Sequence, residues 1–215
     1  NLKAKAVTTT QGSRLVADAT WTDGGLTSGA FDFSGISAQI HADNGAQARA
    51  ASTELRIDIK SAQSAEGQVT GRLTLANLDA PDLEFTGNAT VGIAEFLRWI
   101  DITTWDEASG SARGTLGFTQ HYASLEELGN QGVWGGMWSG TLALSPGRWR
   151  PQGNSVALEV QGGELDLLGQ DLGLRNLKIA IGQSDARVSG RIRNALNDLG
   201  MAHDLQVTSK QLNVG

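Results

Sequence analysis

Apolar and polar residues alternate along much of the chain, which is the period of a β-strand with one face buried and the other in water. The clearest case is LRIDIK at residues 55–60, where three aliphatic side chains alternate with three charged ones. The pattern recurs in VTGRLTL at residues 69–75. We therefore expect a chain made mainly of half-buried strands. The expected strands lie at residues 2–9, 13–21, 26–33, 36–42, 46–59, 69–75, 111–120, 133–144, 156–161, 164–168, 172–181, 186–193 and 204–214.

Short turn signals separate the first of these strands. They are Gln11-Gly12, Asp23-Gly24-Gly25, Ser34-Gly35 and Asn44-Gly45. Asp-Gly and Asn-Gly steps suit a type I′ turn, because glycine and asparagine accept its positive φ at low cost. Strands joined by such turns are antiparallel, so we expect residues 2–60 to form a meander of hairpins.

Short helices interrupt the strands. After residues 69–75 and one further strand, the apolar spacing over residues 93–100 predicts a helix with one apolar face. The residues of that face are Ile93, Phe96, Leu97 and Ile100. We expect the face to cover one end of a curled sheet. Capping signals predict a second helix over residues 124–129, and a third helical turn is expected at residues 195–199.

Four strand segments carry glycine in their third position. They are VTGRLTL at residues 69–75, ARGTLGF at 112–118, WSGTLAL at 138–144 and VSGRIRN at 188–194. Glycine inside a strand marks a bend, a bulge or a close approach of two backbones.

We expect a mostly β fold: an elongated, curled antiparallel sheet, open as a groove, with two or three short helices. It forms either one elongated β region over residues 1–215 or two repeated units over about 1–105 and 106–215.

Composition narrows the classes of function. A net charge of −6 and a pI near 5.0 argue against a nucleic acid partner, which would select clustered lysine and arginine. The chain has no cysteine, which excludes disulfides and thiolate metal sites. Its apolar runs are only a few residues long, so no membrane-spanning helix is expected within it. The abrupt start and end of the sequence suggest an internal fragment of a larger protein.

The sequence offers no arrangement typical of catalysis. His41, His121 and His203 lie far apart, with no partner at metal-ligand spacing. The nucleophile-elbow, Walker and dinucleotide-binding patterns are missing. The adjacent carboxylates at residues 106–107 and 126–127 point in different directions on a strand or a helix, so neither pair forms a dyad. We expect no enzyme activity, no catalytic residue, no metal and no cofactor.

Tryptophan is the one aromatic residue that stands out, with six copies against five phenylalanines and one tyrosine. Trp134 and Trp138 are spaced to fall on one face of a strand. They would either grip a sugar ring or an acyl chain, or pack in a core or over a sheet edge.

Two segments resemble the recurring unit of AsmA-like proteins. One is VTGRLTLANLDAPDLEFTGNATVGIAEFL, in which a strand ending in Asn-Leu leads to a second strand and a short helix. The other is the closing run at residues 172–215, which is similar to that family in its Ser-Gly strand, short helix and final strand with a Ser-x-x-Leu step. The resemblance covers residues 67–101 and 172–215 well, and the rest of the chain only in its β pattern.

This resemblance implies a bacterial envelope protein with a long periplasmic β-groove that carries phospholipid between the inner and outer membranes. The full-length protein would be held to the inner membrane by a helix outside this chain. Its partners would be phospholipid or another acyl-chain lipid, and other envelope proteins through exposed sheet edges. The open alternative is a structural or adhesive β-sandwich or solenoid module without lipid cargo, because apolar faces that meet in a sandwich give the same alternation.

A curled amphipathic sheet would line the groove with its apolar face. An acyl chain lying there gains about 0.8 kcal/mol for each CH₂ group removed from water. The candidate lining residues are Leu55, Ile57, Ile59, Leu73, Leu75, Leu142, Leu144, Val156, Leu158 and Val160.

Overall fold

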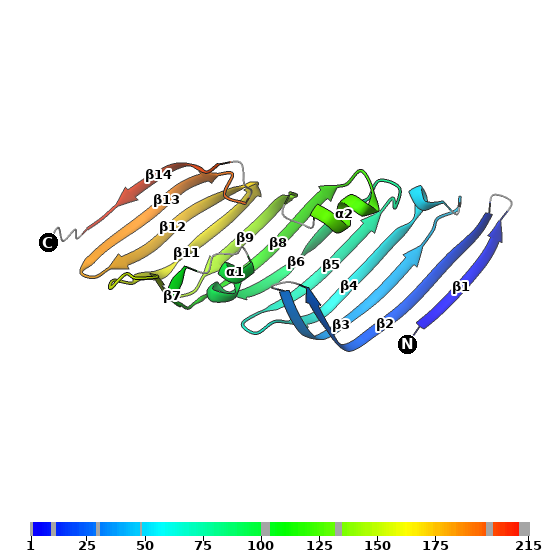
Figure 1. Ribbon diagram of the computed structural model, residues 1–215, viewed down its shortest axis with the longest axis horizontal. Coiled ribbons are helices and arrows are strands. Elements are labelled where there is room, and N and C mark those ends of the chain that lie inside the picture. The colour runs from blue at the N-terminus through cyan, green and yellow to red at the C-terminus, as the bar shows by residue number, and fades with distance from the viewer. Residues whose placement is uncertain are drawn as a thin grey trace. The chain divides into compact units, whose positions relative to one another are not determined.

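The computed structural model describes residues 2–9, 12–28, 31–47, 49–99, 104–131, 135–196 and 200–210. These residues form fourteen strands, two short α-helices and one 3₁₀ turn (Figure 1). The helices are α1 (Ile93–Trp99) and α2 (Leu125–Gln131), and the 3₁₀ turn is Ala50–Ser52. The strands are β1 (Leu2–Thr9), β2 (Gly12–Ser28), β3 (Phe31–Asp43), β4 (Glu54–Gln63), β5 (Gln68–Ala76), β6 (Asp82–Gly92), β7 (Trp105–Ala108), β8 (Ser111–His121), β9 (Met137–Leu144), β10 (Gly147–Pro151), β11 (Leu158–Gly169), β12 (Asp171–Ile181), β13 (Ser184–Arg193) and β14 (Ala202–Thr208).

The strands belong to one sheet with the order β1-β2-β3-β4-β5-β6-β8-β9-β11-β12-β13-β14. Strand β10 pairs with β11 and β7 beside this path. The order runs from β1 to β14, so the sheet is open over the described residues. The expectation of a mostly β fold, built on an open antiparallel sheet with two short helices, is confirmed.

The chain divides into two compact units. Unit 1 consists of residues 1–64, 68–88 and 117–137, and unit 2 of residues 65–67, 89–116 and 138–215. Strands β6 and β8 are each divided between the two units.

In unit 1, two of the expected turns are β-bulges inside long strands. Strand β2 runs through Asp23-Gly24-Gly25, and its pairing with β3 shifts register on both sides of Gly24. Strand β3 likewise runs through Ser34-Gly35 and shifts register against β4 there. Asp23 and Gly35 have φ of 54° and 57°. A bulge can require the same positive φ as a hairpin turn, so the local sequence did not distinguish the two.

The Asn44-Gly45 turn is present where expected. Gly45 has φ of 71°, and its backbone N–H donates to the Asp43 carboxylate at 2.8 Å. The Asn44 side-chain oxygen accepts from the Leu15 backbone N–H at 2.7 Å. The strand expected over residues 46–59 was too long, however, because β4 begins only at Glu54. The 3₁₀ turn precedes it, and a backbone bond from Ser52 to Arg49 closes that turn at 3.0 Å.

In unit 2, the strands expected at residues 156–161 and 164–168 are a single strand, β11. Gly162 and Gly163 form bulges where β11 shifts register against β12. The short strands β7 and β10 were not expected. Residues 194–196 form a turn rather than the expected helix, and residues 197–199 of that prediction lie outside the described part. The start of the strand expected at 133–144 and the end of that expected at 204–214 also lie outside it.

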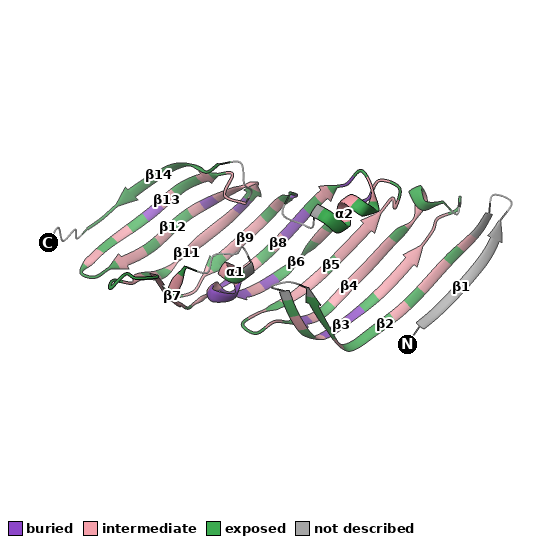
Figure 2. Cartoon of the chain, in the orientation of Figure 1, coloured by how far each residue is buried: buried purple, intermediate pink, exposed green. Residues whose placement is uncertain are grey.

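Among the residues whose burial is described, buried positions are few and lie scattered along the strands and in helix α1 (Figure 2). In unit 1, Ile36, Ala38 and Ala62 form a small buried cluster, with Phe33, Ile57 and Ile59 packed against it. Tyr122 is fully enclosed, and its backbone N–H donates to the Pro81 carbonyl at 2.8 Å. About half of the strand residues whose burial is described are half-buried, and β14 is exposed throughout.

The repeated strand glycines lie where two backbones approach closely. A Cβ on Gly114 would lie 1.9 Å from the Thr141 carbonyl oxygen, and one on Gly190 would lie 2.1 Å from that of Asp204. Gly190 also has φ of 143°, which a residue with a side chain rarely adopts. The sequence-based expectation of a close backbone approach therefore holds at these glycines.

Candidate functional site

Apolar side chains form continuous rows across unit 1. Residues directly opposite each other on paired strands point to the same face. Ile57 lies opposite Ile40 on one side and Leu73 on the other. The neighbouring rows carry the same character. Their members are Ala42, Leu55 and Leu75 in one row, and Ala38, Ile59 and Gly71 in the other. We call this surface the apolar face of unit 1.

The opposite face of the same strands is charged. Asp58 accepts from the Arg72 Nε at 2.7 Å, which lowers the pKa of the Asp58 carboxyl. His41 Nδ1 lies 2.8 Å from the Asp18 carboxylate. Because these contacts cross between strands, they favour the observed register of β2 with β3 and of β4 with β5.

Arg14 and Asp43 form a further ion pair on this charged face. The Arg14 Nε donates to the Asp43 carboxylate at 3.1 Å, and the Gly45 backbone N–H donates to the same carboxylate. The hydrogen bond from Arg14 is the main cause that lowers the pKa of Asp43 to about 2. The pair joins β2 to the end of β3, beside the Asn44-Gly45 turn.

Unit 2 has an apolar face of the same kind. Leu165 lies opposite Leu142 on β9 and Leu174 on β12. Val160 lies opposite Ile179, and Leu158 opposite Ile181. The bulge at Asn176, with φ of 50°, keeps Leu174 and Leu177 on one face, since their partners on β13 are two residues apart. The apolar rows thus continue through the register shift.

Ion pairs also form on the polar face of unit 2. Arg175 bonds the Asp166 carboxylate and lies 3.0 Å from that of Glu164. Thr141 donates its hydroxyl to Asp166 at 2.8 Å, and Arg191 pairs with Asp171 at 2.7 Å. The hydrogen bond from Arg175 lowers the pKa of Asp166. Both units therefore present one apolar and one charged face.

The predicted lining residues fall on these apolar faces. Leu55, Ile57, Ile59, Leu73 and Leu75 share the face of unit 1, and Leu142, Leu144, Leu158 and Val160 share that of unit 2. All nine are half-buried. Val156 lies before β11 begins and is 51% exposed. The structure therefore groups nine of the ten residues in two sets, one in each unit.

In helix α1, the residues of the predicted apolar face are not the most buried ones. Ile93, Phe96 and Leu97 are half-buried, whereas Ile100 lies outside the described residues. The most buried helix positions are Ala94 and Glu95, at 6% and 5% exposure. The Glu95 carboxylate accepts from the Glu66 backbone N–H at 3.2 Å, so the helix holds the connection between β4 and β5.

Two tryptophans add to the apolar face of unit 2. Trp138 lies opposite Gly169, and Trp149 lies opposite Leu158. Trp134, the other tryptophan of the expected pair, lies outside the described residues. Trp149 was not expected on this face because β10 is too short to show a period-two pattern. Its Nε1 is buried and has no hydrogen-bond partner among the described residues.

The histidines and carboxylates of the described residues do not form a metal site. Within the described ranges, no group of three or more histidine, cysteine or acidic residues is placed to hold a metal ion. His121 pairs with Asp82 at 2.8 Å, as His41 does with Asp18. The described helices include none long and apolar enough to cross a membrane.

Comparison with known proteins yields no relative. No protein-family model matches the chain. No curated protein matches it either, and no solved structure does.

Proposed function

We propose that this chain binds the acyl chains of lipids along its apolar faces, as the periplasmic part of an AsmA-like envelope protein. The observation that carries the proposal is the grouping of half-buried aliphatic residues in uninterrupted rows, as in Ile40, Ile57 and Leu73. A side chain that is half-buried within its own unit still offers apolar area to a ligand. The alternative, a structural module without lipid cargo, is an outcome of the test below.

The energetics favour an apolar ligand of this shape. Each CH₂ group transferred from water to an apolar surface gains about 0.8 kcal/mol, so a long chain binds without any specific polar contact. Rows of aliphatic residues run from strand to strand and can follow such a chain. On the other face, an acyl chain would remove water from charged side chains, and this desolvation costs free energy. The apolar face is therefore the more favourable surface for an acyl chain.

Exposed residues on opposite faces of unit 2 give a matched pair of variants. Ile181 lies on the apolar face and is 49% exposed, whereas Leu168 lies on the charged face, opposite Ser139 and Asp171, and is 47% exposed. Both sites are exposed enough to take an asparagine, which adds no charge opposite Asp171. We expect Ile181→Asn to lower the uptake of a fluorescent fatty acid several-fold, and Leu168→Asn to leave it unchanged.

The experiment uses the whole chain, purified from a bacterial host. Native mass spectrometry is expected to detect copurifying phospholipid in the unaltered protein. Delipidated protein that takes up no fatty acid would refute the proposal and favour the structural alternative. Equal losses in the Ile181→Asn and Leu168→Asn variants would also refute it, because binding would then not depend on the apolar face.

A further inference from the structure

Three cations gather at one end of the charged face of unit 2. Lys178 on β12 lies directly opposite Arg187 on β13, which in turn lies opposite Thr208 on β14. Lys210 follows the end of β14. Directly opposed residues of like charge destabilise a sheet, since their Cβ atoms are only about 4.5 to 5.5 Å apart. The pairing of Lys178 with Arg187 is therefore a local cost in the folded protein.

Three of the other arginines on this face are neutralised by carboxylates. Arg175 pairs with Asp166 and Glu164, Arg191 with Asp171, and Arg148 with Glu107 and Glu159. Among the described residues, Lys178, Arg187 and Lys210 have no carboxylate within ion-pair distance. This local excess of positive charge stands out in a chain whose net charge is −6.

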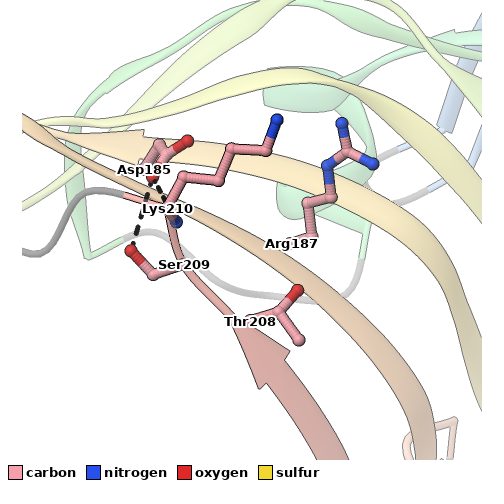
Figure 3. A pocket seen from close by; sticks show the side chains of 5 residues that line it. All are labelled: Asp185, Arg187, Thr208, Ser209 and Lys210. Atoms are coloured by element: carbon pink, nitrogen blue, oxygen red, sulfur yellow. Dashed lines mark hydrogen bonds between the residues drawn. The ribbon is translucent and has the colours of Figure 1, made fainter.

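Two of these cations, Arg187 and Lys210, border a surface hollow of about 220 Å³ (Figure 3). It is lined by Asp185, Arg187, Thr208, Ser209 and Lys210. Figure 3 shows the Lys210 and Arg187 side chains extending in the same direction, with the Thr208 side chain near the base of Arg187 and away from its guanidinium. The Asp185 carboxylate accepts instead from the Lys210 backbone N–H at 3.1 Å and the Ser209 hydroxyl at 3.4 Å.

We infer that this hollow binds a phosphate group. A guanidinium offers two parallel N–H donors to an oxyanion, an ammonium adds a compact positive charge, and a hydroxyl supplies a third kind of donor. Lys178, one strand away, adds to the positive potential. Asp185 opposes the anion, so the net local charge is +2 from three cations and one carboxylate. The site lies on the charged face and does not depend on lipid binding to the apolar face.

A phosphate group has two sources, a lipid headgroup at a membrane surface and a free phosphate in solution. The first measurement titrates the amide resonances of the whole chain with sodium phosphate, against sodium chloride at equal ionic strength. We expect saturable shifts confined to residues 185–187 and 208–210. Arg187→Gln and Lys210→Gln should each weaken binding about threefold to tenfold, and Asp185→Asn should tighten it.

Arg113→Gln is the control, because Arg113 is an exposed arginine of β8 with no ion pair among the described residues. It should leave the phosphate affinity unchanged. Shifts that chloride reproduces, or that Arg113→Gln reduces as much as Arg187→Gln does, would overturn the inference. So would the absence of saturable shifts.

The second measurement separates the two sources by flotation with vesicles. Binding to phosphatidylglycerol vesicles, but not to phosphatidylcholine vesicles, that is lost in Arg187→Gln identifies an anionic headgroup as the ligand. Phosphate-induced shifts without vesicle binding identify a soluble phosphate. Both results support a phosphate site. Vesicle binding that survives Arg187→Gln and Lys210→Gln together would contradict a headgroup at this hollow.

Discussion

Gly71 on β5 and Gly87 on β6 approach so closely that a Cβ added to Gly71 would lie 2.7 Å from the Gly87 Cα. The same Cβ would lie 2.4 Å from the Thr86 carbonyl oxygen, and Gly71 has φ of 153°. The ring of Phe85 lies beside both glycines. Position 71 therefore requires glycine for two reasons, because a side chain would clash with β6 and because the backbone has a positive φ.

The first prediction follows from this contact. Gly71→Ala should destabilise the protein by about 1 to 3 kcal/mol or more, because the backbone must leave a conformation that alanine adopts only with strain. Urea unfolding followed by tryptophan fluorescence measures the loss. Gly129→Ala is the control, since Gly129 lies in helix α2 and an added Cβ would meet no described atom within 4 Å beyond its chain neighbours and its own helix backbone. This variant should raise the free energy of unfolding by up to about 1 kcal/mol through helix propensity.

The second prediction concerns Tyr122, which is fully enclosed beside Pro81. Tyr122→Ala should cost about 3 to 5 kcal/mol, the range for large aromatic side chains removed from a packed site. Tyr122→Phe keeps the ring and should cost less than half as much. The free energy of unfolding in urea measures both. A near-zero loss for Tyr122→Ala would contradict the tight packing of this residue.

The third prediction is a pH dependence at Asp43. Its pKa is lowered to about 2, chiefly by the hydrogen bond from Arg14, whereas an unfolded aspartate titrates near 3.9. The resulting stabilisation is complete above about pH 4 and is lost as the pH falls toward 2. In Asp43→Asn this part of the acid dependence should disappear.

Urea unfolding at a series of pH values between about 5 and 2 measures this dependence. Asp79→Asn, at an exposed turn residue, is the control and should leave the acid dependence as it is in the unaltered protein. An Asp43→Asn variant with an unchanged acid slope would show that the Arg14 contact contributes nothing in solution.

The fourth prediction tests whether the apolar face of unit 1 also takes an acyl chain. Leu73→Ser places a hydroxyl in the row of Ile40 and Ile57 and should lower fatty-acid affinity several-fold. Arg72→Ser, on the charged face one residue away, should leave it unchanged. Fluorescent fatty-acid titration measures both. Variants of equal affinity would exclude this face from lipid binding.

Much of the fold was accessible from the sequence where the period-two pattern is long. The strands over residues 69–75, 111–120, 172–181 and 186–193 lie within a few residues of their expected limits. The pattern failed at β7 and β10, which have only 4 and 5 residues. It also failed at Asp23-Gly24-Gly25, where the chain bulges and continues, because turn and bulge share the same local conformation.

The sequence by itself determined which side chains share a face, because the direction of a side chain alternates with each residue of a strand. That is why Leu55, Ile57 and Ile59 were grouped correctly before any pairing was known. Only the tertiary structure decided which strands are neighbours, and therefore that Ile57 meets Ile40 and Leu73, and that Lys178 meets Arg187. Strand pairing depends on how well segments distant in the chain fit together, and the local alternation of apolar and polar residues does not contain that information.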